Sequence, residues 1–134
     1  MRLVPQPRGG SDSAPSGQID FRLARHAVVS EYRKGRLGKD EVCDAHPELI
    51  RAARNVGTPT GETCPICEDG ALVQVSYAFG PGLPPSGLTV AGDEELRRLS
   101  RRSRELACYV VEVCPVCAWN HLTRSFPVGR SPGN

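Results

Sequence analysis

The sequence predicts an α+β fold in which an N-terminal helical hairpin is followed by a zinc-ribbon β-sheet with an inserted helix. Three observations lead to this prediction: apolar residues at helical spacing before residue 57, alternating apolar residues in later segments, and two Cys-Pro-x-Cys turns beside those segments. The chain has 134 residues, of which 39% are hydrophobic, and it contains six cysteines. So little apolar material builds only a small core, and small cores usually depend on a metal or on disulfides.

The composition divides the chain into four segments. Residues 1–17 and 128–134 are rich in Pro, Gly and Ser, and such segments bury too little apolar surface to offset the entropy lost on ordering. We therefore expect them to be disordered tails. Between them we expect a helical unit at 18–57 and a zinc-ribbon unit with an inserted loop and helix at 58–127.

The helical unit contains two clear helical patterns. Phe21, Ala24 and Val28 recur at helical spacing and predict a helix over 19–34. A short helical turn is expected at 40–43. A second helix begins at Pro47, a residue favoured at the first helical position, and ends at Gly57. Two helices with a bent connection predict the hairpin.

The second half is predicted to alternate between loops, strands and one helix. The expected order is a loop at 58–70, a strand at 72–79, a loop at 80–87, a helix at 93–106, and strands at 107–113 and 119–126. Three Gly and three Pro in the segment GPGLPPSG mark the central loop, and Pro127 is expected to end the last strand.

Two Cys-x-x-C turns carry the strongest chemical signal. They are C-P-I-C at 64–67 and C-P-V-C at 114–117. One such turn lets two thiolates converge on an ion, and two turns supply the four tetrahedral ligands of a closed structural zinc site. We therefore expect one Zn²⁺ ion per chain, bound by Cys64, Cys67, Cys114 and Cys117.

A redox role for the pairs is the alternative. A thioredoxin-like C-x-x-C motif lies between a strand and a helix, whereas both pairs here are expected on loops beside strands. The chain has no stretch of about 18 apolar residues and no apolar signal region, so we expect a cytoplasmic protein, in which thiols stay reduced. Four protein ligands leave no open metal position, and no known catalytic motif is present. We expect no enzymatic activity.

The two remaining cysteines are expected to be packing residues. Cys43 precedes His46 by three residues, which leaves a second metal or a reactive thiol as the alternative to a small buried side chain between two helices. Cys108 lies within the strand segment A-C-Y-V-V.

Candidate partner contacts lie in two places. Trp119, His121 and Arg124 follow the second cysteine pair, and Arg33, Lys34 and Arg36 form a basic run. The formal net charge is +2, and four thiolates around a divalent ion add about −2, so bulk charge does not favour nucleic acid. Trp119 is expected either to pack on the zinc loops or to contact a partner.

Two longer motifs carry a family resemblance. They are E-V-C-D-A-x-P-x-L-x-R-A-A at 41–53 and V-V-E-V-C-x-x-C-x-W-N-H-L at 110–122. With the first cysteine pair between them, this order resembles an uncharacterised actinobacterial family of small zinc-ribbon-like proteins. The resemblance spans about 20–127 and implies the same zinc-binding body, with the segment 41–44 as part of it. It implies no activity.

These observations support three hypotheses of function. The first is a non-enzymatic adaptor or regulator that docks on a larger machine such as RNA polymerase or the ribosome, by analogy with other zinc ribbons. The second is direct nucleic-acid binding through the basic residues. The third is a zinc- or redox-responsive switch in which loss of the metal frees the thiols. We expect a protein partner rather than nucleic acid, membrane or a small-molecule substrate.

Overall fold

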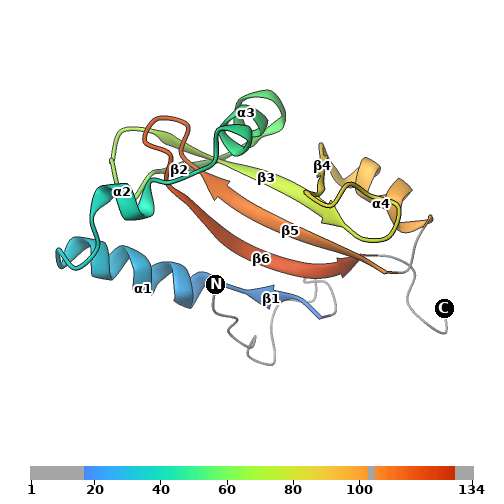
Figure 1. Cartoon of the computed structure of the whole chain (residues 1–134), viewed down its shortest axis with the longest axis horizontal. Helices are drawn as coiled ribbons and strands as arrows, with labels where there is room; N and C mark the ends of the chain where they lie inside the picture. Colours follow the sequence, from blue (N-terminus) through green and yellow to red (C-terminus); the bar gives the residue numbers. More distant parts are fainter. Residues whose placement is uncertain (1–16, 103–104, 129–134) are drawn as a thin grey trace.

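The described part of the chain is built around an antiparallel sheet of six strands (Figure 1). The computed structural model describes residues 17–102 and 105–128. The strands are β1 (Ile19–Asp20), β2 (Thr58–Thr63), β3 (Ala71–Phe79), β4 (Leu88–Val90), β5 (Leu106–Val113) and β6 (Asn120–Val128). Their order is β1-β6-β5-β3-β2, and β4 pairs with β3 outside this order. Each pairing is antiparallel.

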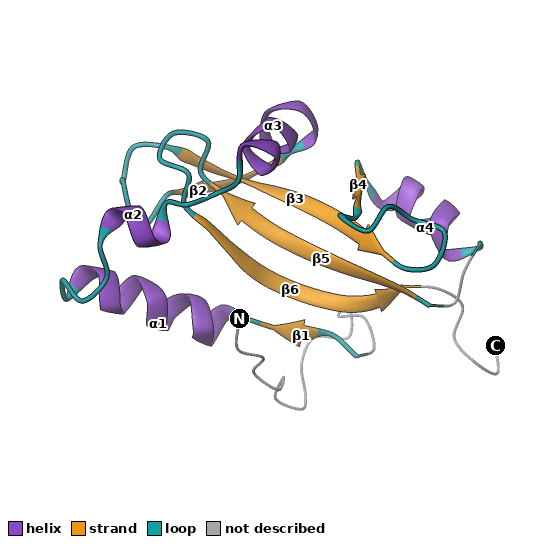
Figure 2. Cartoon of the chain, in the orientation of Figure 1, coloured by secondary structure: helices purple, strands orange, loops and turns teal. Residues whose placement is uncertain are grey.

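Among the described residues, four helices lie around the sheet (Figure 2). They are α1 (Arg22–Arg33), α2 (Lys39–Val42), α3 (Pro47–Val56) and α4 (Asp93–Ser100). α1 continues from β1 and contacts β6, whereas α3 contacts β3, β4 and β5. The two longer helices of the N-terminal region therefore pack on different parts of the sheet.

The predicted fold class, an N-terminal helical hairpin followed by a zinc-ribbon sheet, is wrong. There is no N-terminal helical hairpin followed by a separate ribbon, because Ile19 pairs with Ser125 of β6 and so joins the start of the described chain to the main sheet. The apolar side of α3 is covered by strand residues rather than by α1. A helix of 10 to 12 residues is marginal alone in water, and the large sheet supplies the apolar surface that both helices need.

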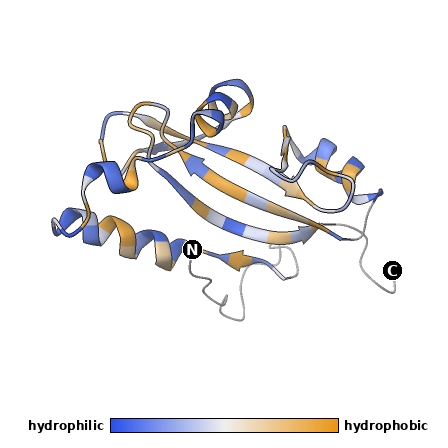
Figure 3. Ribbon diagram, viewed as in Figure 1, coloured by the Kyte–Doolittle hydropathy of each residue, from blue (hydrophilic) through white to orange (hydrophobic). Residues whose placement is uncertain are grey.

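Within residues 17–102 and 105–128 the core consists of three clusters on and around the sheet. One lies under α3 and contains Ala53, Val75 and Val113. A second lies on the opposite face of β3 and β5, where Ala78, Cys108 and Val110 meet Leu99 of α4. The third surrounds the cysteines and includes Val29 of α1, Val42 of α2, Leu72 and Trp119. Apolar residues run along β3 and β5, while α4 shows a hydrophilic outer side (Figure 3).

Several element boundaries differ from the expected ones. The region 58–70 contains β2, and 88–90 forms β4. β2 has no alternating apolar pattern, and β4, with three residues, is too short for alternation to identify it; pairing with β3 defines both. α4 ends at Ser100, and Leu106 already belongs to β5, where it pairs with Val128. Of the predicted tails, only Gly17 and Val128 are described, and Val128 ends β6.

Candidate metal centre

Both cysteine pairs lie at one end of the sheet because β3 and β5 are antiparallel neighbours. The first pair precedes β3 and the second follows β5. In the register of these strands Val73 faces Val113, so the start of β3 meets the end of β5 (Figure 1). Strand pairing therefore brings together Cys67 and Cys114, which have 46 residues between them in the chain.

Each cysteine pair lies in a tight turn between two strands. In the first turn, the Ile66 N–H donates to Cys64 Sγ at 3.4 Å and the Gly70 N–H donates to Cys67 Sγ at 3.3 Å. Such N–H donors stabilise negative charge on sulfur. They are a feature of a turn that holds thiolates rather than of one that merely contains cysteines.

The two turns share a backbone conformation. The residue after the second cysteine is left-handed in both, with φ of 57° at Glu68 and 76° at Ala118. The second turn closes through the Cys114 N–H, which donates to the Trp119 carbonyl at 2.8 Å, and the Ala118 N–H, which donates to the Cys114 carbonyl at 2.8 Å. Similar turns therefore aim both cysteine pairs at one point.

The four sulfurs of Cys64, Cys67, Cys114 and Cys117 are positioned to hold a metal ion. All lie within 4.8 Å of one another. Two sulfur–sulfur distances, Cys64 to Cys117 and Cys67 to Cys114, are 3.7 Å. Tetrahedral zinc with Zn–S bonds of about 2.3 Å implies sulfur–sulfur separations of about 3.8 Å. The spacing and the chemistry of the donors fit a closed four-thiolate site.

The electrostatics of the thiols also favour a bound cation. Burial raises the pKa of Cys64 to about 12 and that of Cys117 to about 12. Burial opposes ionisation of Cys67 as well, but the N–H groups of Gly70 and Asp69 outweigh it and lower the pKa of Cys67 to about 7. A metal ion supplies the positive charge that stabilises all four thiolates together.

Gly70 allows the two turns to approach each other. It is buried, and a Cβ atom built on it would overlap Cys114 Sγ and lie 2.9 Å from the Cβ of Val116. No side chain fits between the first turn and the second. This requirement is not visible in the sequence, because Gly70 lies there in an ordinary Asp-Gly turn before a strand.

A fifth sulfur lies beside the centre. The Cys43 thiol, at the end of α2, donates to Cys117 Sγ at 3.3 Å. Cys43 is half-buried, and burial raises its pKa. The same segment is tied to the second turn, because the Asn120 amide donates to Asp44 Oδ1 at 3.0 Å. Cys43 is thus a packing residue and also a neighbour of a metal-binding sulfur, whereas Cys108 is buried in β5 as predicted.

A buried ionic network joins the second cysteine turn to α1. Glu112 of β5 is 6% exposed, and its Oε2 accepts from Trp119 Nε1 at 2.7 Å and from Arg25 Nε at 2.7 Å. The network links α1 to the strand that ends in Cys114. The sequence carried one signal for it, a lone acidic residue within an apolar strand, since buried carboxylates need partners.

Trp119 packs on the cysteine turns, which is one of the two alternatives expected for it, and neither Trp119 nor His121 is exposed beside the cysteines. Trp119 is fully buried and His121 is 7% exposed. Their rings stack with centroids 5.9 Å apart. Trp119 is buried because its large indole ring fills much of the small core around the sulfurs. Their role as partner contacts stays a prediction.

The predicted basic contacts do not form one patch. Arg33, Lys34 and Arg36 are exposed around the end of α1, where Arg36 pairs with Glu31 at 3.2 Å. Arg124 lies in β6 opposite Asp20, near the start of α1, and stacks over Phe126 at 5.0 Å. A helix of 12 residues, about 18 Å long, separates the two places.

The chain matches known proteins over most of its length. Among the described residues no helix is long and apolar enough to span a membrane. The chain is 43% identical over 113 residues to the uncharacterized protein Rv0049 of Mycobacterium tuberculosis and to the uncharacterized protein Mb0050 of Mycobacterium bovis. Each alignment covers 84% of this chain and 82% of the relative. No solved structure matches. Residues 15–134 match the model of a family of unknown function, DUF5318, and the chain belongs to that family.

Proposed function

We propose that this protein is a small, non-enzymatic, zinc-binding adaptor or regulator that docks on a larger protein assembly of the RNA polymerase or ribosome type. The observation that carries the proposal is the closed set of four sulfurs, all within 4.8 Å of one another. A closed shell leaves no position for water or substrate, so the metal serves structure rather than catalysis. The proposal places the protein in the cytoplasm, where its thiols stay reduced.

Zinc is the metal that this site suits best. A tetrahedral set of four thiolates takes zinc or iron, and the turns are tied by strands on both sides, as a structural site requires. Metal analysis of protein purified under reducing conditions is expected to give one zinc and no iron per chain. A chain without metal that keeps its fold in chelator would contradict the proposal.

The adaptor role is tested by capture from lysate. The metal-loaded chain serves as bait in nuclease-treated lysate, and the Cys64→Ser variant, which lacks one ligand, serves as the matched control. We expect the loaded chain to retain defined subunits of one assembly that the control loses. A bait that retains nothing, or that retains material only before nuclease treatment, would refute a protein-docking role.

A redox-responsive switch is a second candidate, favoured by the Cys43 thiol at 3.3 Å from Cys117 Sγ. A hydroperoxide would oxidise the Cys117 thiolate to a sulfenic acid and leave as an alcohol or water. The Cys43 thiol would then attack the sulfenic sulfur of Cys117, which forms the Cys43–Cys117 disulfide and releases the sulfenic oxygen as water. The metal would lose one ligand.

The switch is tested by zinc release under peroxide. A chromogenic chelator is expected to report faster release from the native chain than from Cys43→Ala, and mass mapping is expected to find the Cys43–Cys117 peptide pair. Cys108→Ala is the matched control because Cys108 lies in another cluster. Equal rates in all three proteins would refute the switch and leave the structural role of the metal intact.

A further inference from the structure

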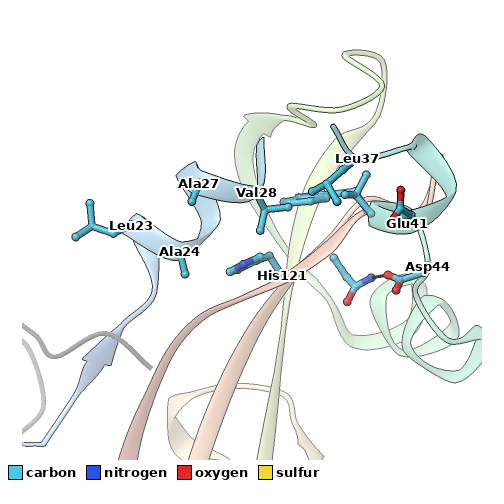
Figure 4. Close-up of a pocket in the computed structure, with 11 residues that line it drawn as sticks. Leu23, Ala24, Ala27, Val28, Leu37, Glu41, Asp44 and His121 are labelled. Atoms are coloured by element: carbon cyan, nitrogen blue, oxygen red, sulfur yellow. Dashed lines mark hydrogen bonds between the residues drawn. The ribbon is translucent and has the colours of Figure 1, made fainter. Parts of the chain in front are cut away.

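A groove lies between α1, α2 and the start of β6. Its volume is about 680 Å³, and its lining comes from α1, the α1–α2 turn, α2 and residues 119–121. Figure 4 shows Leu23 at one end, Glu41 and Asp44 at the other, and Val28, Leu37 and His121 between them. The groove is separate from the sulfurs, although Trp119 borders both.

The α1 side of the groove is apolar and open. It consists of Leu23, Ala24, Ala27 and Val28. Leu23 is 68% exposed, and Ala27 is exposed as well. The two alanines keep this side of the helix flat. The exposed leucine and the small residues beside it form an apolar helix face. An apolar side chain of a partner can be buried against this face.

The polar side chains of the groove have donors already in use. Both hydrogens of the Asn120 amide are directed to carbonyl or carboxylate oxygens, Ala118 O at 3.3 Å and Asp44 Oδ1 at 3.0 Å. The Trp119 N–H donates to Glu112. His121 Nδ1 lies 2.7 Å from the Leu122 carbonyl, which only accepts, so Nδ1 carries the hydrogen and Nε2 is left as an acceptor.

The charges of the groove have one sign. Glu41 and Asp44 line it, and no lysine or arginine is among the lining residues in the described part of the chain. Each carboxylate makes one local bond, Glu41 to the Gly38 N–H and Asp44 to Asn120, and both residues are exposed. Each carboxylate therefore retains capacity to accept. The groove offers hydrogen-bond acceptors and negative charge, and it lacks free side-chain donors.

We propose that this groove binds a protein segment that places aliphatic or aromatic side chains on α1 and lysine or arginine side chains against Glu41 and Asp44. Charge complementarity selects the cationic end. The apolar end and the acidic end lie at opposite ends of the groove (Figure 4), so the occupant is elongated, as in the binding of an amphipathic segment. This inference rests on the proposed adaptor function and names the surface and the partner chemistry.

The probe is a short acetylated peptide with leucines at helical spacing followed by two arginines. The peptide carries a fluorescent label whose anisotropy reports occupancy, because Trp119 borders the groove but is fully buried. Two comparison peptides carry citrulline for arginine, or serine for leucine. We expect saturable binding of the first peptide and roughly three- to tenfold weaker binding of the citrulline peptide. Equal affinity of all three peptides would overturn the proposal.

Variants of the full chain locate the binding. Glu41→Gln with Asp44→Asn removes both charges and keeps the local acceptors, and it is expected to weaken arginine-peptide binding roughly three- to tenfold. Glu48→Gln with Glu62→Gln removes the same charge from exposed sites outside the groove and is expected to leave binding unchanged. Ala27→Lys is expected to weaken binding, and His26→Lys is its control. A loss that is equal in variants and controls would overturn the proposal.

Other occupants give different results. A dimer in sedimentation that Ala27→Lys dissociates would assign the groove to a second copy. Magnetisation transfer from the Trp119 or His121 ring to residues 1–16 would assign it to the chain itself. Either result would overturn the proposal. Capture of the same subunits by the Glu41→Gln, Asp44→Asn chain as by the native chain would overturn the groove but support the adaptor function. Peptide binding without any captured subunit would refute the adaptor function and support the groove.

Discussion

Replacing Glu112 by leucine tests whether the buried network holds α1 on the second cysteine turn. Glu112 is 6% exposed, and one of its oxygens accepts from both Trp119 and Arg25. Leucine has a similar volume and no acceptor. The Trp119 N–H, fully buried, would then have no partner, which costs about 1–3 kcal/mol.

The charge of Arg25 adds to this cost. Removing one partner of a fully buried ion pair costs about 3–5 kcal/mol, but the Arg25 side chain is 25% exposed and reaches water, so a smaller share applies. We expect Glu112→Leu to lower the free energy of unfolding by about 3 kcal/mol in total. Glutamine keeps a carbonyl acceptor for Trp119 and loses only the charge, so Glu112→Gln is expected to cost about 1 kcal/mol.

The assay is urea unfolding at fixed free zinc, followed by far-ultraviolet circular dichroism, since the fluorescence of Trp119 changes with the substitution itself. Fixed free zinc is needed because metal binding adds to the measured stability. Glu62→Leu, at an exposed position of β2, is the matched control and is expected to change stability by less than about 0.5 kcal/mol. A cost below about 1 kcal/mol for Glu112→Leu, or equal costs for leucine and glutamine, would refute the reasoning.

Three further predictions concern the centre and its surroundings. Cys114→Ser is expected to lose the metal and to unfold in the cysteine cluster, whereas Cys108→Ser is expected to keep one zinc per chain by metal analysis; equal zinc contents would contradict the assignment. Gly70→Ala is expected to weaken zinc binding at least tenfold in a chelator competition, since its Cβ would overlap Cys114 Sγ, while Gly92→Ala, with open space around it and an extended backbone, serves as the control for a glycine substitution. Burial lowers the pKa of His121. Below about pH 6.5 the unfolded chain therefore binds more protons than the folded chain, and the free energy of unfolding falls as the pH drops. His121→Gln is expected to flatten this pH dependence in urea titrations at fixed free zinc, and an unchanged slope would contradict the prediction.

Local patterns in the sequence predicted the elements whose residues carry their own signal. Pro47 and Gly57 bounded α3, and alternation located β3 and β5 to within one residue. The spacing of the cysteines identified the four sulfurs that the sheet brings together. These features depend on local backbone preferences and on the spacing of two ligands within one short turn, both of which can be read from neighbouring residues.

Features set by tertiary contact were not predictable in this way. β2 lacks an alternating pattern and β4 is too short to show one, and both form because β3 offers backbone groups for pairing. The helical hairpin was wrong because the apolar stripes of α1 and α3 each match the sheet as well as each other. The contact of Cys43 with Cys117 joins residues that are far apart in the chain and carries no spacing signal.

The 46-residue separation of Cys67 and Cys114 has a consequence for the unfolded chain. A metal bound by both turns closes a long loop of the chain, as a disulfide does. On the chain-entropy view, closing a loop of this length lowers the conformational entropy of the denatured ensemble by an amount equivalent to about 4 kcal/mol. The ion would thereby act before the sheet is complete, by keeping the β2–β3 and β5–β6 hairpins within reach of each other. A single cut in the central segment 80–87 would then leave two fragments held by the ion and by the pairing of β3 with β5. Such a nicked protein is expected to stay associated, and to dissociate at a lower urea concentration once zinc is removed.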